Sequence, residues 1–139
     1  MRHEATLRRF FAVLEDLDMK ATAAFCADDC VYEDVPVGEV ATAVGRAAIE
    51  AKLTGAFRDV EKLVTTVHEI AEQGDTVLVE RTEVWHHPTG EQVPLPVMAV
   101  FKFRGDEITL WRDYWDMKML FDSQPASWLQ RMAEAGAAS

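Results

Sequence analysis

The chain has 139 residues, of which 49% are hydrophobic and 27% are charged. This balance excludes a disordered chain, which lacks the apolar content for a core, and seven glycines are far too few for a collagen. The formal net charge is −10 and no run is rich in lysine and arginine, so nucleic acids and membranes are not expected partners. We expect one domain that spans residues 1–139.

The first part of the chain is predicted to be helical. Apolar side chains at helical spacing predict an amphipathic first helix of about four turns: Leu7, Phe10, Phe11, Leu14 and Leu17. A short second helix is expected over residues 19–27. A third helix is expected after Gly45, where the same period runs from Ile49 to Val60.

Alternating patterns predict a sheet. A short strand is expected over residues 30–35, and longer strands over roughly 62–71, 76–86, 93–104 and 108–117. Helices followed by long antiparallel strands are typical of an α+β fold. If the sheet curves strongly around the helices it encloses a pocket, and residues 118–135 are expected to cover that pocket as a last helix.

The cysteines and the N-terminus indicate the cellular compartment. The first 18 residues mix charged and apolar side chains without a long apolar run, so a secretory signal is not expected. Cys26 and Cys30 then suit a reducing cytoplasm as buried free thiols. The four histidines show no zinc-type spacing with them, so a metal site is not expected.

Charged side chains fall on apolar faces of two predicted strands. Residues two apart on a strand share one face of the sheet, so Arg81 and Glu83 lie on the face that carries Val79 and Trp85. An unpaired buried carboxylate is costly. We therefore expect these two charged groups to be paired and to line a cavity.

The same count applies to the last and the first strand. It places Asp113 between Trp111 and Trp115, and it puts Tyr32 and Asp34 on one side of the early strand. We expect these side chains to join the same interior cluster.

The opposite faces of the strands offer an alternative core. Leu78 and Leu110 would then be buried, and the charged residues would form solvated cross-strand pairs. That arrangement exposes Trp85, Trp111 and Trp115 together, an apolar patch that monomeric surfaces rarely carry. The pattern therefore favours the interior cluster.

An arginine between two carboxyl groups has a specific chemical use. A guanidinium can donate to both groups, while a shared site of low dielectric lets one carboxyl keep its proton and leaves the other ionised. One acid and one base then face the same ligand. The sequence holds no G-x-G-x-x-G, Walker or G-x-S-x-G motif that would indicate another chemistry.

Four segments carry a resemblance to a known family: VYEDVP (31–36), VERTEVW (79–85), LPVMAVFKF (95–103) and ITLWRDYWD (108–116). They resemble limonene-1,2-epoxide hydrolase and its relatives, and the W-R-D-Y-[FW]-D run is the most specific part. The resemblance implies a cone-shaped, curved mixed sheet wrapped around three N-terminal helices. This is the ketosteroid-isomerase-like or cystatin-like α+β fold, which nuclear transport factor 2-like proteins share. A homodimer without metal or cofactor is also implied.

The resemblance further implies one-step addition of water to a small apolar epoxide, which gives a vicinal diol. Asp113 would deprotonate the water, Glu83 would protonate the epoxide oxygen, and Arg81 would link the two carboxyl groups. Tyr32 would help to hold the water, together with the residue at position 34. The pocket walls that bind the substrate would be Trp85, Trp111 and Trp115.

Two positions depart from the family's pattern. Glu83 stands where the family usually has Asp, and its extra methylene should move the proton donor and reshape the pocket. Asp34 stands where an Asn usually holds the water. An Asp lacks the amide donor unless it is protonated, so Asp34 adds a third titratable carboxyl to the site.

Two other function classes stay open. The run FCADDCVYEDVPVGEV is also similar to the ketosteroid isomerases, which use an Asp at the position of Asp34 to move a proton between carbons. Their oxyanion-stabilising acid would fall near Ala99, whose methyl group cannot donate a hydrogen bond. Polyketide-type cyclases share the fold and stay possible for the same reason. The third class is a non-catalytic module that binds a small ligand, which the fold also permits.

Overall fold

The computed structural model describes residues 2–138, with the side chains of 2–135. Its strands are β1 (Cys26–Asp34), β2 (Ala43–Val44), β3 (Lys62–Gln73), β4 (Thr76–His86), β5 (Gln92–Arg104) and β6 (Glu107–Tyr114). They form one mixed sheet in the order β2-β1-β6-β5-β4-β3. The β1–β6 pair is parallel and the other pairs are antiparallel, so the first long strand lies beside the last.

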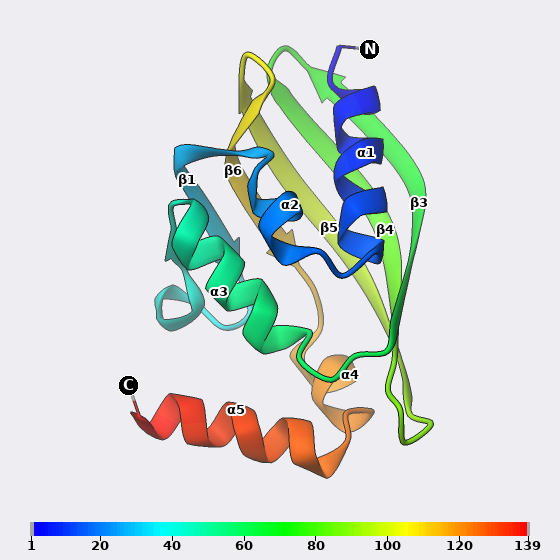
Figure 1. Cartoon of the computed structure of the whole chain (residues 1–139). Coiled ribbons are helices and arrows are strands. Elements are labelled where there is room, and N and C mark those ends of the chain that lie inside the picture. Colours follow the sequence, from blue (N-terminus) through cyan, green and yellow to red (C-terminus); the bar gives the residue numbers. More distant parts are fainter. Residues whose placement is uncertain (1, 139) are drawn as a thin grey trace.

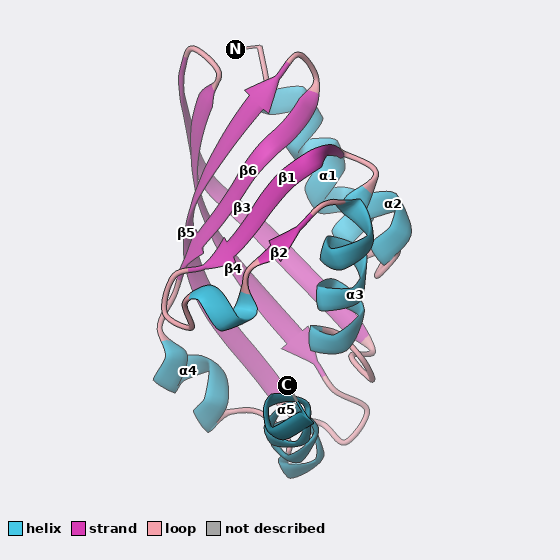
Figure 2. Cartoon of the chain, turned by 90° about the vertical axis from the view of Figure 1, so that its left-hand side faces the viewer, coloured by secondary structure: helices cyan, strands magenta, loops and turns pink. Residues whose placement is uncertain are grey.

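Over residues 2–138, five α-helices accompany the sheet. The first three, α1 (Glu4–Glu15), α2 (Met19–Ala23) and α3 (Arg46–Ala56), lie on the concave side of the curved sheet (Figures 1 and 2). The last two, α4 (Met117–Asp122) and α5 (Ala126–Ala138), lie at one end, and a 3-10 turn, η1 (Glu39–Ala41), precedes β2. The predicted α+β fold, with a curved mixed sheet around three N-terminal helices, is therefore confirmed. None of the described helices is long and apolar enough to cross a membrane.

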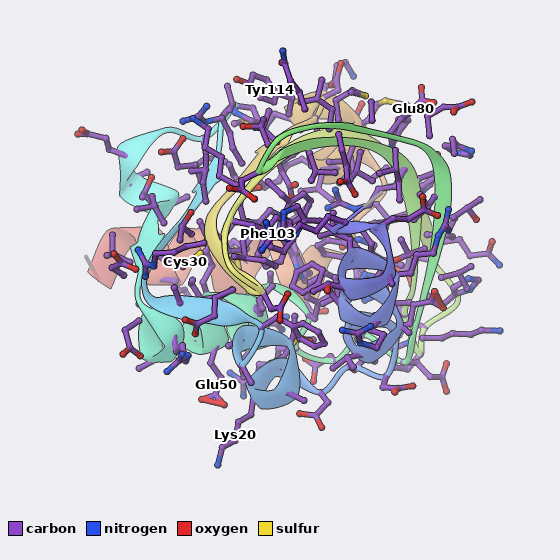
Figure 3. The ribbon with its side chains drawn as sticks, turned by 90° about the horizontal axis from the view of Figure 1, so that it is seen from above. Lys20, Cys30, Glu50, Glu80, Phe103 and Tyr114 are labelled. Atoms are coloured by element: carbon purple, nitrogen blue, oxygen red, sulfur yellow. The ribbon has the colours of Figure 1, made fainter. Side chains whose placement is uncertain are left out.

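The apolar face of α1 fills the concavity of the sheet. Leu7, Phe10, Phe11 and Leu14 are all buried, as their helical spacing predicts. The Phe10 ring meets the Trp111 ring edge to face, with centroids 4.9 Å apart. Helix α1 therefore packs directly behind a residue of the predicted site, and Figure 3 shows the curved sheet closing around this helix.

The second helix is shorter than predicted, and β1 is longer. Helix α2 ends at Ala23, and β1 begins at Cys26, which pairs with Ile108 of β6. Pairing with the sheet overrides the helical tendency of the alanines in this segment. Cys26 and Cys30 are buried free thiols, as expected.

The tail also differs from the prediction. Strand β6 ends at Tyr114, because Asp116 caps α4 by accepting a hydrogen bond from the Met119 amide at 3.0 Å. Residues 123–125 then separate two helices where one was expected, since Pro125 cannot continue α4. Helix α5 lies across the end of the sheet (Figure 1), and Trp128 donates from Nε1 to the Ala56 carbonyl at 2.8 Å.

Candidate active site

A cavity of about 760 Å³ lies between the sheet and α3, with α4 and α5 at one end. This size falls in the usual range for small-molecule sites. Most of the wall is apolar, from valines and alanines around β2 and α3 to side chains of the last two helices. The polar groups of the wall are contributed chiefly by three strands and one helix: Tyr32, Asp34, Lys52, Glu83 and Asp113.

Arg81 bridges Glu83 and Asp113 at this wall. It donates from Nε and Nη2 to Glu83 Oε2 at 3.2 and 3.0 Å. It also donates from Nη1 to Asp113 Oδ1 at 3.2 Å and from Nη2 to Oδ2 at 3.0 Å. All three residues are at most 4% exposed. Both carboxyl groups line the cavity and Arg81 does not. The guanidinium therefore contacts them on the side that faces away from the cavity.

The bridge crosses a whole strand, because β5 lies between β4 and β6. Two strand spacings amount to about 9.5 Å, which only a long side chain can span. On β5, Val97 pairs with Arg81 and Ala99 pairs with Asp113. The small methyl group of Ala99, itself buried, leaves room for the guanidinium to reach β6.

Three tryptophans that were predicted as walls also orient carboxyl groups. Trp85 donates from Nε1 to Glu83 Oε1 at 3.0 Å, and Trp111 donates to Asp113 Oδ1 at 2.9 Å. In both pairs the partners are two residues apart on one strand. Trp115, just beyond the end of β6, donates to Asp34 Oδ1 at 2.8 Å. Each carboxyl group of the cluster therefore has its own indole donor.

The parallel register of β1 and β6 brings the remaining predicted residues into place. Tyr32 pairs with Trp111 and Asp34 with Asp113, so the two aromatic residues and the two acids lie side by side. The rings of Tyr32 and Trp111 stack with centroids 3.7 Å apart and planes 6° apart. Seven of the eight residues that the sequence singled out thus line the cavity, and the eighth, Arg81, lies behind two of them.

Lys52 was missed by the sequence analysis. It extends from α3 into the cavity, where Nζ lies 2.8 Å from Asp34 Oδ2 and 3.7 Å from the centroid of the Tyr32 ring. A lysine on an amphipathic helix is usually solvated, and nothing in the spacing distinguishes this one. Only the packing of α3 against β1 shows that Lys52 faces inward.

The environment shifts the pKa values of three groups. Burial raises the pKa of Asp113 to about 6, an effect that the Arg81 charge opposes and the Asp34 charge reinforces. Burial raises the pKa of Tyr32 well above its ordinary value, and the charges of Asp34 and Asp113 add to this effect. The phenol therefore stays neutral. Burial acts to lower the pKa of Arg81, but the charges of Asp113 and Glu83 outweigh it and keep the guanidinium ionised.

Hydrogen bonding indicates which carboxyl oxygens can react. Each carboxylate oxygen has two lone pairs. Two donors occupy Glu83 Oε2, and two occupy Asp113 Oδ1. Oε1 of Glu83 and Oδ2 of Asp113 each accept one bond, from Trp85 and Arg81 respectively. These two oxygens can therefore carry or accept a proton at the cavity.

Comparison with known proteins gives consistent results. Residues 7–111 match the model of the SnoaL-like domain family. Epoxide hydrolase EphG of Mycobacterium tuberculosis is 31% identical over 113 residues, which cover 81% of this chain and 72% of that protein. The structure of an M. tuberculosis LEH-like epoxide hydrolase matches with a TM-score of 0.72 and 26% identity, covering 99% of this chain and 97% of that one.

A third protein supports the fold alone. It comes from Catenulispora acidiphila, has a ketosteroid isomerase-like fold, and matches with a TM-score of 0.77 at 23% identity, covering 90% of this chain and 97% of that one. Together, the matches confirm the resemblance to epoxide hydrolases and the fold class that the sequence predicted.

Proposed function

The chain belongs to the SnoaL-like domain family, and from that premise we propose that it is a cofactor-independent epoxide hydrolase acting on small apolar epoxides. The observation that carries the proposal is the Arg81 bridge, which presents two carboxyl groups side by side to a largely apolar cavity. The epoxide hydrolase relatives make this chemistry the first candidate for such a site.

The reaction follows from the two reactive oxygens. Asp113 Oδ2 takes a proton from a water molecule, and the water oxygen attacks one epoxide carbon. The bond from that carbon to the epoxide oxygen breaks, and Glu83 Oε1 delivers a proton to the oxygen. The product is a vicinal diol. Solvent then returns the proton from Asp113 to Glu83, and the enzyme regains its starting state.

The other residues of the cluster support this step. The neutral hydroxyl of Tyr32 can donate a hydrogen bond to the attacking water or accept one from it. Asp34 lies next to Asp113, where it can accept a second hydrogen bond from the same water. Arg81 stays ionised throughout and fixes the separation of the acid and the base. The three indole rings of Trp85, Trp111 and Trp115 form the apolar side of the substrate site.

The proposal is tested with a panel of small apolar epoxides in water labelled with oxygen-18. We expect vicinal diols that carry one labelled oxygen, at a rate well above the reaction without protein. Absence of labelled diol across the panel would overturn the proposal.

A second candidate is proton transfer between carbon atoms, with Asp34 as the base. It is favoured by the position of Asp34 in the cavity, although Ala99 offers no donor to a developing oxyanion. The two candidates differ in the residue that they require. Loss of activity in Asp34→Asn, with full activity in Asp113→Asn, would favour the second.

A further inference from the structure

The cavity holds a second ion pair, formed by Lys52 and Asp34, and the epoxide-opening step described above gives Lys52 no role. The Lys52 ammonium contacts Asp34 Oδ2, and Trp115 donates to Oδ1, so each oxygen of the carboxyl group has a donor. An ammonium in direct contact with one oxygen forms a charge-assisted pair with a carboxylate, and a neutral carboxyl group lacks the charge for that pair. The geometry therefore matches an ionised Asp34.

An ionised Asp34 needs a cation in this environment. Its side chain is only 14% exposed, and its register partner is Asp113, a second acid. Burial of a carboxylate without a counter-charge costs several kcal/mol. The charged or titratable groups around it come from four elements: Lys52 from α3, Tyr32 from β1, Asp113 from β6, and Arg81 and Glu83 from β4.

Arg81 cannot serve as this cation, because its hydrogen bonds go to Glu83 and Asp113. Lys52 is placed to do so, with its ammonium held between the Asp34 carboxylate and the face of the Tyr32 ring. The Asn that the family resemblance implies at position 34 needs no counter-ion. The Asp that stands here does, and Lys52 supplies it.

We propose that Lys52 is a positioning residue that keeps Asp34 ionised, so that Asp34 accepts a hydrogen bond from the water molecule that Asp113 deprotonates. The role in water activation rests on the proposed hydrolase function, whereas the charge state of Asp34 does not. The negative charge of Asp34 adds to the effect of burial on the pKa of Asp113, which makes Asp113 a stronger base.

The kinetic test compares Lys52→Met, Asp34→Asn and the double variant on an epoxide that the wild type hydrolyses. Each single change leaves one buried charge without its partner, so we expect each to lower kcat at least tenfold. The double variant restores a neutral pair, like the amide of the family pattern, and we expect it to be more active than either single variant. If the two losses simply multiply in the double variant, Lys52 does not act through Asp34 and the proposal is overturned.

A matched control and a conservative variant separate this role from general stability. Lys20→Met makes the same change on α2, where Figure 3 shows Lys20 pointing away from the molecule, and it should leave kcat unchanged. Lys52→Arg keeps the charge and should retain more activity than Lys52→Met. Circular dichroism establishes that each variant folds, and the double variant keeps the test open if Lys52→Met alone unfolds.

Infrared difference spectroscopy tests the charge state without any substrate. At neutral pH, Lys52→Met should show one additional protonated carboxyl group relative to the wild type, and the double variant should not. An unchanged spectrum would show that Asp34 stays ionised without Lys52, which overturns the proposal. If the wild type opens no epoxide, the hydrolase proposal fails, but this spectrum still decides whether Lys52 keeps Asp34 ionised.

Discussion

Shortening Glu83 by one methylene is the sharpest test of the proposed acid. In the structure, the carboxyl group of Glu83 contacts Trp85 through Oε1 and Arg81 through Oε2, with the closest bonds at 3.0 Å. A carbon–carbon bond is about 1.5 Å long. In Glu83→Asp, one of these contacts therefore opens to about 4.5 Å, which is beyond hydrogen-bond range.

The expected loss follows from this displacement. Misplacement of a catalytic group by about 1 Å can cost about a hundredfold in rate, which corresponds to about 2.7 kcal/mol of barrier. Glu83→Gln keeps the length but cannot transfer a proton, and general acid catalysis contributes about 10²- to 10⁴-fold. We therefore expect Glu83→Asp to retain slow turnover and Glu83→Gln to be nearly inactive.

The assay is diol formation under saturating epoxide, so that kcat is compared directly. Glu80→Gln is the matched control, because Glu80 lies on the same strand but on the opposite face of the sheet, where it points outward into solvent (Figure 3). Wild-type turnover by Glu83→Gln would show that Glu83 only holds Arg81 and Trp85 in place, and the acid would have to be sought elsewhere.

Four further outcomes are expected. Asp113→Asn should lower turnover by about 10²- to 10⁴-fold without unfolding the protein, as checked by circular dichroism; near-normal activity would assign the base to Asp34. Because Asp113 must be ionised to accept a proton and its pKa is raised to about 6, kcat/KM should fall about tenfold per pH unit below that value, and a flat profile would contradict this. Ala99→Leu should block the path of Arg81, reduce turnover and destabilise the fold by about 1–3 kcal/mol in thermal unfolding, whereas normal values for both would refute the role of the small methyl group. Sedimentation should find a homodimer, because Leu78, Met98 and Tyr114 are exposed on the outer face of the sheet; a monomer at micromolar concentration would count against it.

The grouping of charged and aromatic residues at the cavity wall could be predicted because strand alternation is a strict property of the backbone. Residues two apart share a face whatever the sheet packs against, so the grouping of Arg81 with Glu83, and of Trp111 with Asp113, needed no tertiary information. The predicted end of the last strand, near residue 117, was wrong, because β6 ends at Tyr114 and α4 begins at Met117.

The rest of the site depends on contacts that no local pattern encodes. Lys52 faces inward only because α3 packs against β1, and Ala99 matters only because β5 separates two strands that a single guanidinium joins. The start of β1 at Cys26 likewise depends on its partner Ile108, which lies far along the chain. Local propensity is a weak guide where such pairing decides the structure.

The parallel pairing of β1 with β6 also determines when the site can form during folding. The hydrogen bond between Trp115 and Asp34 joins residues 81 positions apart, and the bridge between Arg81 and Asp113 joins residues 32 apart. Contacts between distant residues require loop closure before they contribute stability, which slows folding. A chain that is still missing β6 lacks Asp113, which is the proposed base, the Trp111 ring that stacks on Tyr32, and the partner of β1. Catalytic activity should therefore appear only in the last phase of refolding, after the helical signal of α1 and α3 has developed.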